Sequence, residues 1–179
     1  MHTKEKVAAL SLAGILAFIF VLPIGSVFAS PPMNLSFQTS SGNSAGWVTG
    51  PGSSSSEAYL TIDSSAPGSF AVIYVHHTPS TLPSAEPSYT PVGYASGTPR
   101  IFIFMSDGNY IFIYPDSVLG AGYVSSTNLG TVLYTTWASS ETGSGATVTA
   151  VYIIADTSQA IPYTAYITSF QYDGVTLIG

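Results

Sequence analysis

The chain has 179 residues, a formal net charge of −6 at pH 7 and no cysteine, so a domain of this size must be stabilised by packing rather than by disulfides. With three basic residues in total it has no patch to displace counterions from phosphates, which excludes nucleic acid and anionic membrane surfaces as partners. Charged residues make up only 7% of a chain that is 46% hydrophobic, which excludes a disordered protein and indicates a Ser-, Thr-, Tyr- and Gly-rich surface that is mostly covered.

Residues 1–29 have the layout of a secretory signal peptide. Two lysines precede an apolar run from Val7 to Leu22, and Pro23 interrupts this pattern before a cleavage site that ends at Ala29. The alternative is a retained membrane anchor, but the run is shorter than the roughly 20 residues that span a bilayer. We expect removal of this leader, which leaves Arg100 as the one basic residue of an extracellular or cell-surface protein without a membrane segment.

Residues 30–44 combine a short strand, Met33–Gln38, with a soft linker, residues 39–44. The strand alternates polar residues with the apolar residues Met33, Leu35 and Phe37, as expected when one face is buried. The linker that follows is rich in Ser, Gly and Asn, so it permits the strand to pair with its own domain or with another subunit. Asn34 begins an N-glycosylation sequon, and the alternation directs its side chain away from the apolar residues.

Residues 45–179 show strands and turns without a convincing helix, and they predict a single β-sandwich domain. The expected strands are Ala45–Thr49, Ala58–Asp63, Ser69–His76, Arg100–Met105, Tyr110–Tyr114, Thr131–Trp137, Ala146–Ala155, Tyr163–Tyr172 and Val175–Ile178. Asp-Gly pairs within Ser106–Asn109 and Tyr172–Val175 predict two hairpins with type I′ turns. The fold class that follows is all-β: an antiparallel two-sheet sandwich, most simply a jelly roll.

Two longer segments interrupt the predicted strands. Gly50–Ser56 is a serine run typical of a flexible loop. Thr78–Pro99 carries five prolines, so we expect it to run extended over the surface without joining a sheet. A loop of this kind either covers a sheet or binds a ligand, and covering is the simpler expectation.

The hairpin predicted over Arg100–Tyr114 is apolar on both of its faces. One face carries Ile101, Ile103, Met105, Ile111 and Ile113, and the other carries Phe102, Phe104, Tyr110, Phe112 and Tyr114. A sheet with one side in water alternates apolar with polar residues, so the aromatic face of this hairpin is expected to be covered. The cover is either the proline-rich segment or an adjacent subunit.

No sequence pattern indicates catalysis, a cofactor or a bound metal. CxxC, HExxH, GxSxG and phosphate-loop motifs are absent, and the adjacent His76 and His77 at a strand end should point to opposite faces. A glycosidase needs two carboxylates across a cleft, whereas Glu57, Glu86 and Glu141 lie in or beside Ser- or Pro-rich loops, where solvent exposure is expected. We therefore predict that the protein is not an enzyme and holds no cofactor or metal.

An N-terminal strand behind a cleavage site, joined by a soft linker to a lysine-poor, cysteine-free sandwich, resembles secreted filament subunits that polymerise by donor-strand complementation. These are the archaeal bundling pili and threads and the TasA-type bacterial biofilm matrix fibres. The resemblance implies that the N-terminal strand of one jelly-roll subunit completes the sheet of the next. It assigns Met33, Leu35 and Phe37 to the subunit interface and makes another copy of the chain the partner, in a head-to-tail homopolymer.

A monomeric secreted module that binds carbohydrate or a surface is the alternative function. Its partners would be glycans or the cell surface, and its binding platform would be drawn from the aromatic residues Trp47, Tyr89, Tyr94, Tyr123 and Trp137. Aromatic residues in a sandwich are more commonly part of the core.

Overall fold

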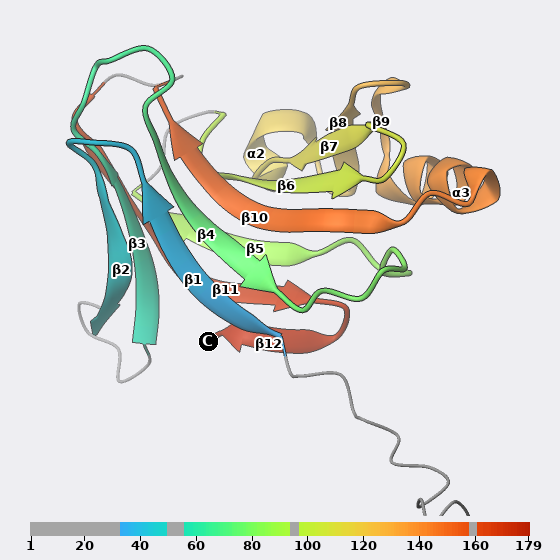
Figure 1. Ribbon diagram of the computed structural model, residues 1–179, viewed down its shortest axis with the longest axis horizontal. Coiled ribbons are helices and arrows are strands. Elements are labelled where there is room, and N and C mark those ends of the chain that lie inside the picture. Colours follow the sequence, from blue (N-terminus) through green and yellow to red (C-terminus); the bar gives the residue numbers. More distant parts are fainter. Residues whose placement is uncertain (1–32, 50–55, 94–96, 158–160) are drawn as a thin grey trace, which may run out of the picture. The chain divides into compact units, whose positions relative to one another are not determined.

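The computed structural model describes residues 33–49, 56–93, 97–157 and 161–179, which fold into two antiparallel β-sheets (Figure 1). Sheet A has the strand order β1 (Asn34–Thr39), β4 (Phe70–His76), β10 (Val148–Asp156), β6 (Arg100–Met105), β7 (Tyr110–Ile113), β8 (Tyr123–Ser126) and β9 (Gly130–Leu133). Sheet B has the order β12 (Val175–Ile178), β11 (Tyr163–Tyr172), β3 (Ser56–Ile62) and β2 (Ser44–Thr49), and β5 (Ser88–Val92) pairs with β11. The prediction of an all-β antiparallel sandwich is confirmed, and the jelly-roll topology stays a prediction.

The sandwich lies within one compact unit, Pro32–Gly179. The predicted signal peptide, residues 1–29, and nearly all of the serine run after β2 lie outside the described residues. Within the described part of the chain, no helix is long and apolar enough to cross a membrane.

The hydrophobic core lies between the two sheets, because alternate residues of each strand point inward. Sheet A contributes the fully buried Ile73, Ile101, Ile103, Ile111, Val151 and Ile153, and sheet B contributes Leu60, Ile62, Ala165, Ile167 and Phe170. Each of these side chains except that of Ala165 stabilises the fold by about 1.5–3 kcal/mol through burial. The strands predicted from β-branched and aromatic residues therefore supply most of the core.

A helix, α3 (Tyr134–Ser144), follows β9, so the prediction of a chain without helices is wrong. The strand predicted over Thr131–Trp137 is present only up to Leu133, where β9 ends. The helix buries Tyr134, Trp137 and Glu141, whose spacing of three and four residues places them on one helical face. It ends at Gly145, which adopts a left-handed φ of 77°. Packing of this face overrides the β-propensity of the Thr, Tyr and Trp residues in its first turn. A second, four-residue helix, α2 (Asp116–Leu119), follows β7.

The proline-rich segment joins sheet B, contrary to the prediction that it stays outside the sheets. Its strand β5 pairs with β11, and Pro91 stands opposite Ile167. Among the described strands β5 pairs with β11 alone, and a proline is tolerated in such an edge strand because the missing N–H can face away from the ladder. Strand β8 was also not predicted, because its four residues, Tyr123–Ser126, are too few to show a period.

The two predicted hairpin turns differ in type. At Ser106–Asn109 only Gly108 has a positive φ, 90°, and its amide nitrogen lies 3.1 Å from the carbonyl oxygen of Met105. A type I′ turn requires positive φ at both central residues, so that prediction is wrong here. Asp173 and Gly174 have φ values of 50° and 73°, and the type I′ prediction is confirmed at the β11–β12 turn.

Candidate functional site

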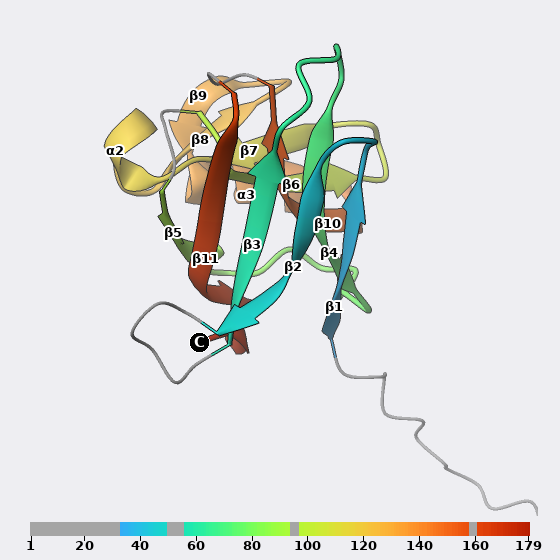
Figure 2. The same ribbon diagram turned by 90° about the vertical axis from the view of Figure 1, so that its left-hand side faces the viewer.

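Strand β1 forms one edge of sheet A and lies beside β4 (Figure 2). The two strands pair antiparallel from Asn34↔His76 to Thr39↔Ala71. The predicted N-terminal strand is therefore present, and in the single chain it pairs with its own domain. Because β1 has no second strand neighbour in the described sheet, one ladder of hydrogen bonds holds it in place.

The inward side of β1 carries the three apolar residues assigned to a subunit interface. Met33, Leu35 and Phe37 are half-buried and pack against the core. The ring of Phe37 meets that of Trp47 on β2 edge to face, with centroids 5.4 Å apart and planes at 87°. Trp47 is still 49% exposed, so these rings only partly cover the side of the sandwich where β1 and β2 face each other.

The outward side of β1 is polar. Ser36 Oγ lies 2.6 Å from Nε2 of His76 on β4, a hydrogen bond between the outer face of β1 and that of its neighbour. Asn34 and Gln38 are exposed. The side chain of Asn34 is therefore accessible, and its glycosylation stays a prediction.

The linker from β1 to β2 is held by hydrogen bonds rather than loose. Ser40 N bonds to the Phe70 carbonyl at 3.0 Å, and Ser40 Oγ accepts the Phe70 N–H at 2.9 Å. Asn43 Oδ1 accepts the amides of Asp63 and Ser64, both at 3.0 Å, and Asn43 Nδ2 donates to Ser40 Oγ at 2.7 Å. Ser40 thus holds the end of β1 against β4. Asn43 holds the start of β2 against the end of β3 and also donates to the Phe70 carbonyl of β4 at 3.4 Å.

The outer face of sheet A carries a row of four aromatic residues that stand opposite one another on neighbouring strands. This aromatic row consists of Tyr74 on β4, Tyr152 on β10, Phe102 on β6 and Phe112 on β7. From Tyr74 to Phe112, the centroids of successive rings are 5.9, 4.7 and 5.0 Å apart. All four rings stay partly exposed in the single chain.

The described residues of the proline-rich segment, 78–93 and 97–99, do not cover this row, so for them the first of the two expected covers is wrong. The segment packs Leu82 against the core and then pairs through β5 with sheet B. The other expected cover, an adjacent subunit, stays a prediction.

The aromatic residues considered as a sugar platform do not gather at one place. Trp137 is fully buried in the core, and Tyr94 lies outside the described residues. Trp47 is exposed on β2 of sheet B, whereas Tyr123, 42% exposed, lies on β8 of sheet A. Tyr89 donates its hydroxyl to the carbonyl of Pro99 at 2.8 Å and lines a cavity.

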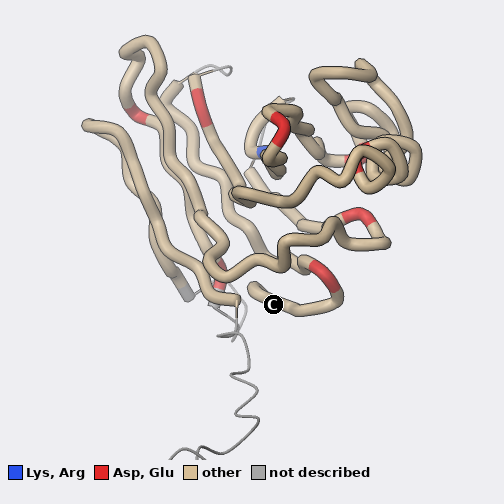
Figure 3. Tube along the Cα trace, turned by 45° about the vertical axis from the view of Figure 1, so that its right-hand side comes forward, with Lys and Arg blue, Asp and Glu red and all other residues tan. Residues whose placement is uncertain are grey.

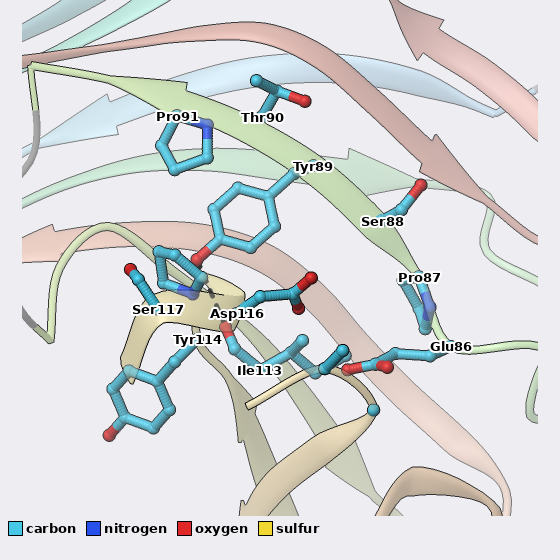
Figure 4. Close-up of a pocket in the computed structure, with 13 residues that line it drawn as sticks. Glu86, Pro87, Ser88, Tyr89, Thr90, Pro91, Ile113, Tyr114, Asp116 and Ser117 are labelled. Carbon is cyan, nitrogen blue, oxygen red and sulfur yellow. Dashed lines mark hydrogen bonds between the residues drawn. The ribbon is translucent and has the colours of Figure 1, made fainter. Parts of the chain in front are cut away.

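This cavity, with a volume of about 440 Å³, opens between β5 and α2 (Figure 4). Its lining includes Glu86, Tyr89, Pro91, Ile113, Tyr114 and Asp116. Burial, and secondly repulsion from Asp116, raises the pKa of Glu86 from 4.5 to about 7. The sequence showed Glu86 only as a loop carboxylate, because residues 86 and 116 are brought together by the packing of sheet B on sheet A.

The expectation that the glutamates are solvent-exposed is wrong. Glu57 and Glu141 are 7% and 1% exposed, and Glu86 is half-buried. Glu141 accepts hydrogen bonds from Asn128 at 2.8 Å and from Asn109 at 3.4 Å, so it joins α3 to the β6–β7 and β8–β9 turns. That arrangement is structural, since both partners are amides that satisfy a buried carboxylate.

No protein-family model, no curated protein sequence and no solved structure matches the chain, so its function is inferred from geometry and chemistry.

Proposed function

We propose that the protein is an extracellular structural subunit that polymerises into a pilus-like filament. In the filament, β1 of one subunit occupies the position beside β4 of the next subunit that β1 occupies here in its own domain. The observation that carries this proposal is the attachment of β1: an edge strand with a single neighbour, followed by a four-residue linker. A segment attached in this way can be exchanged between identical copies without loss of native contacts.

The energetics of such an exchange depend on the apolar side of β1. Met33, Leu35 and Phe37 would contact the same core residues in either copy, so exchange preserves burial worth very roughly 5 kcal/mol for three half-buried side chains. Main-chain bonds to β4 are preserved in the same way. Head-to-tail insertion does not close on itself and therefore propagates a fibre.

The linker contacts indicate where the chain would part. Ser40 bonds to Phe70 of β4, so on exchange it would accompany β1 to the neighbouring subunit. Asn43 accepts the amides of Asp63 and Ser64, so it would stay with its own sheet B, and its hydrogen bond to Ser40 would then be made to Ser40 of the neighbouring subunit. The crossing between subunits then falls at Ser41 and Gly42, and Gly42 already has a φ of 83° that favours glycine.

Monomeric glycan binding receives less support from the same face. Sugar rings stack on free aromatic faces. The rings of Phe102 and Tyr152 instead stack on each other, with centroids 4.7 Å apart and an angle of 16° between their planes. The aromatic row therefore presents mainly ring edges, which suit an apolar protein surface better than a sugar. For this reason we favour the structural role.

A cysteine pair tests whether β1 is exchanged. Gln38 and Val72 stand directly opposite on β1 and β4, within the reach of a disulfide, and the natural chain has no cysteine. The variant Gln38→Cys with Val72→Cys is allowed to assemble under reducing conditions and is then oxidised. We expect fibres by electron microscopy and a ladder of covalent oligomers on non-reducing gels.

The matched control is Thr61→Cys with Thr164→Cys. These residues stand opposite on β3 and β11 with hydroxyl oxygens 2.8 Å apart, so their disulfide stays within one chain whether or not β1 exchanges. Fibres in which the first pair also cross-links only within single chains would show that β1 stays in its own domain, and the proposal would be wrong.

A further inference from the structure

The cavity between β5 and α2 holds negative charge that the described residues do not neutralise. Glu86 and Asp116 direct their carboxyl groups into the same space (Figure 4). No lysine or arginine lines this cavity. Arg100 is the one lysine or arginine of the described residues (Figure 3). It forms an ion pair with Asp156 and donates to the Gly97 carbonyl at 2.7 Å.

The remaining walls of the cavity combine apolar residues with the polar residues Ser88, Thr90 and Ser117. Prolines 87, 91 and 115 and the side chain of Ile113 line it together with the rings of Tyr89 and Tyr114. The hydroxyl of Tyr89 is bonded to the carbonyls of Pro99 and Ile113 at 2.8 and 3.4 Å, which fixes its ring against the start of β6 and the end of β7. A volume of about 440 Å³ lies within the range of small-molecule sites.

We propose that this cavity binds a primary ammonium group carried on an alkyl stem, the chemistry of an alkylamine or of a lysine side chain. An ammonium group has three donors and one compact charge, so it can bond to both carboxylates at once. The alkyl stem would lie against the proline and tyrosine walls. No lysine occurs within the described residues, so the described part of the chain does not supply this ligand to another copy.

Other ligand classes fit the cavity less well. Anions are excluded by the two carboxylates. No group of three or more His, Cys, Asp or Glu residues that could hold a metal ion occurs in the described ranges. A neutral apolar ligand would leave Glu86 and Asp116 desolvated without a partner. The site is independent of β1 exchange.

Binding of an ammonium ion at this site must be coupled to the proton on Glu86. The ionisable groups around that carboxyl are Asp116 from α2, Tyr134 from α3 and Asp173 from the β11–β12 turn, and none of them is cationic. A cation beside Glu86 favours its ionised form, so the ligand displaces a proton. Binding should therefore be weaker at pH 5.5 than at pH 8.

Isothermal titration calorimetry of the protein with n-butylammonium tests the site, and n-butanol serves as the neutral control. We expect a millimolar dissociation constant at pH 8, weakening by about tenfold at pH 5.5, and no binding of n-butanol. Glu86→Gln should weaken binding by about tenfold and remove the pH dependence, and Asp116→Asn should weaken it similarly, since each removes a charge-assisted contact. Asp63→Asn, which changes an exposed carboxylate at the end of β3, should bind as the natural protein does.

Nα-acetyl-lysine N-methylamide distinguishes the source of the ammonium group. Tighter binding than n-butylammonium would assign the site to a lysine of a partner protein, and equal or weaker binding would assign it to a free amine. Circular dichroism establishes that each variant is folded before titration. The proposal is overturned if n-butylammonium does not bind at 50 mM, or if folded Glu86→Gln and Asp116→Asn bind it as tightly as the natural protein.

Discussion

Phe37 of β1 and Trp47 of β2 meet edge to face, with ring centroids 5.4 Å apart, across the side where the edge strands of the two sheets face each other. Because of this contact, Trp47 fluorescence reports whether a β1 strand is bound beside β4, whether that strand comes from the same chain or from another subunit. The second tryptophan, Trp137, is fully buried and remote in sequence from β1 and β2. Its emission provides an internal reference.

Replacement of Phe37 by alanine should weaken the packing of β1 against the core. We expect a loss of about 1–3 kcal/mol in the free energy of unfolding, below the usual cost for a fully buried phenylalanine because Phe37 is half-buried. Trp47 emission should shift to longer wavelength. Urea unfolding followed by fluorescence measures both effects. Gln38→Ala changes an exposed neighbour and should alter neither, and equal effects of both variants would contradict the assigned seat.

Charges on the inward side of β1 should abolish assembly. In Leu35→Asp with Phe37→Asp, two carboxylates would have to enter an apolar seat without partners, which is strongly unfavourable. Electron microscopy and sedimentation should show no fibres. Ser36→Asp with Gln38→Asp places the same charge on the outward side and should still assemble. Fibres from the first variant that match those of the natural protein would rule out β1 as the joining strand.

A free β1 peptide should bind to a protein that lacks its own strand. A chain truncated before Thr39 exposes the edge of β4, and a synthetic peptide of residues 30–44 can occupy it. Since the peptide binds only the folded state, it should raise the melting temperature with increasing concentration. A peptide with Leu35 and Phe37 changed to Asp is the control. No difference between the two peptides would argue against a side-chain-specific seat.

The raised pKa of Glu86 predicts how stability depends on pH. Between pH 4.5 and about 7 the folded protein holds a proton on Glu86 that the unfolded chain has released, so this residue destabilises the fold increasingly as the pH rises, and the cost is constant above that range. Glu86→Gln should therefore be more stable than the natural protein at pH 8, by about 1–2 kcal/mol after solvent screening. Below pH 4.5 the two should be equal.

Denaturant unfolding at a series of pH values measures this difference. Asp63→Asn removes an exposed carboxylate and provides the control for the change in net charge. A stability gain in Glu86→Gln that is the same at pH 4 and pH 8 would contradict the assigned environment of Glu86.

Parts of the fold that depend on neighbouring residues were predictable. The β-branched and aromatic residues of Arg100–Met105 and Tyr163–Tyr172 identified strands with the observed ends, because such side chains favour an extended backbone whatever strand it pairs with. Asp173-Gly174 identified a type I′ turn, because few other residues adopt two successive positive φ angles. The strand over residues 34–39 was predicted from its alternation of apolar and polar residues, within one residue.

Tertiary contacts decided the rest, since local preference was weak or misleading there. Residues 134–137 have β-forming side chains, yet they form the start of α3 because Tyr134 and Trp137 fill the core from one helical face. The prolines of residues 78–99 suggested an unpaired loop, but the free edge of β11 accepts β5. The cavity depends on the same β5–β11 pairing, because this pairing brings Glu86, which precedes β5, toward Asp116, which follows β7. By itself the sequence determined which segments form strands and which faces of those strands are apolar. Long-range packing determined which strands pair, because no local pattern encodes contacts between residues so distant along the chain.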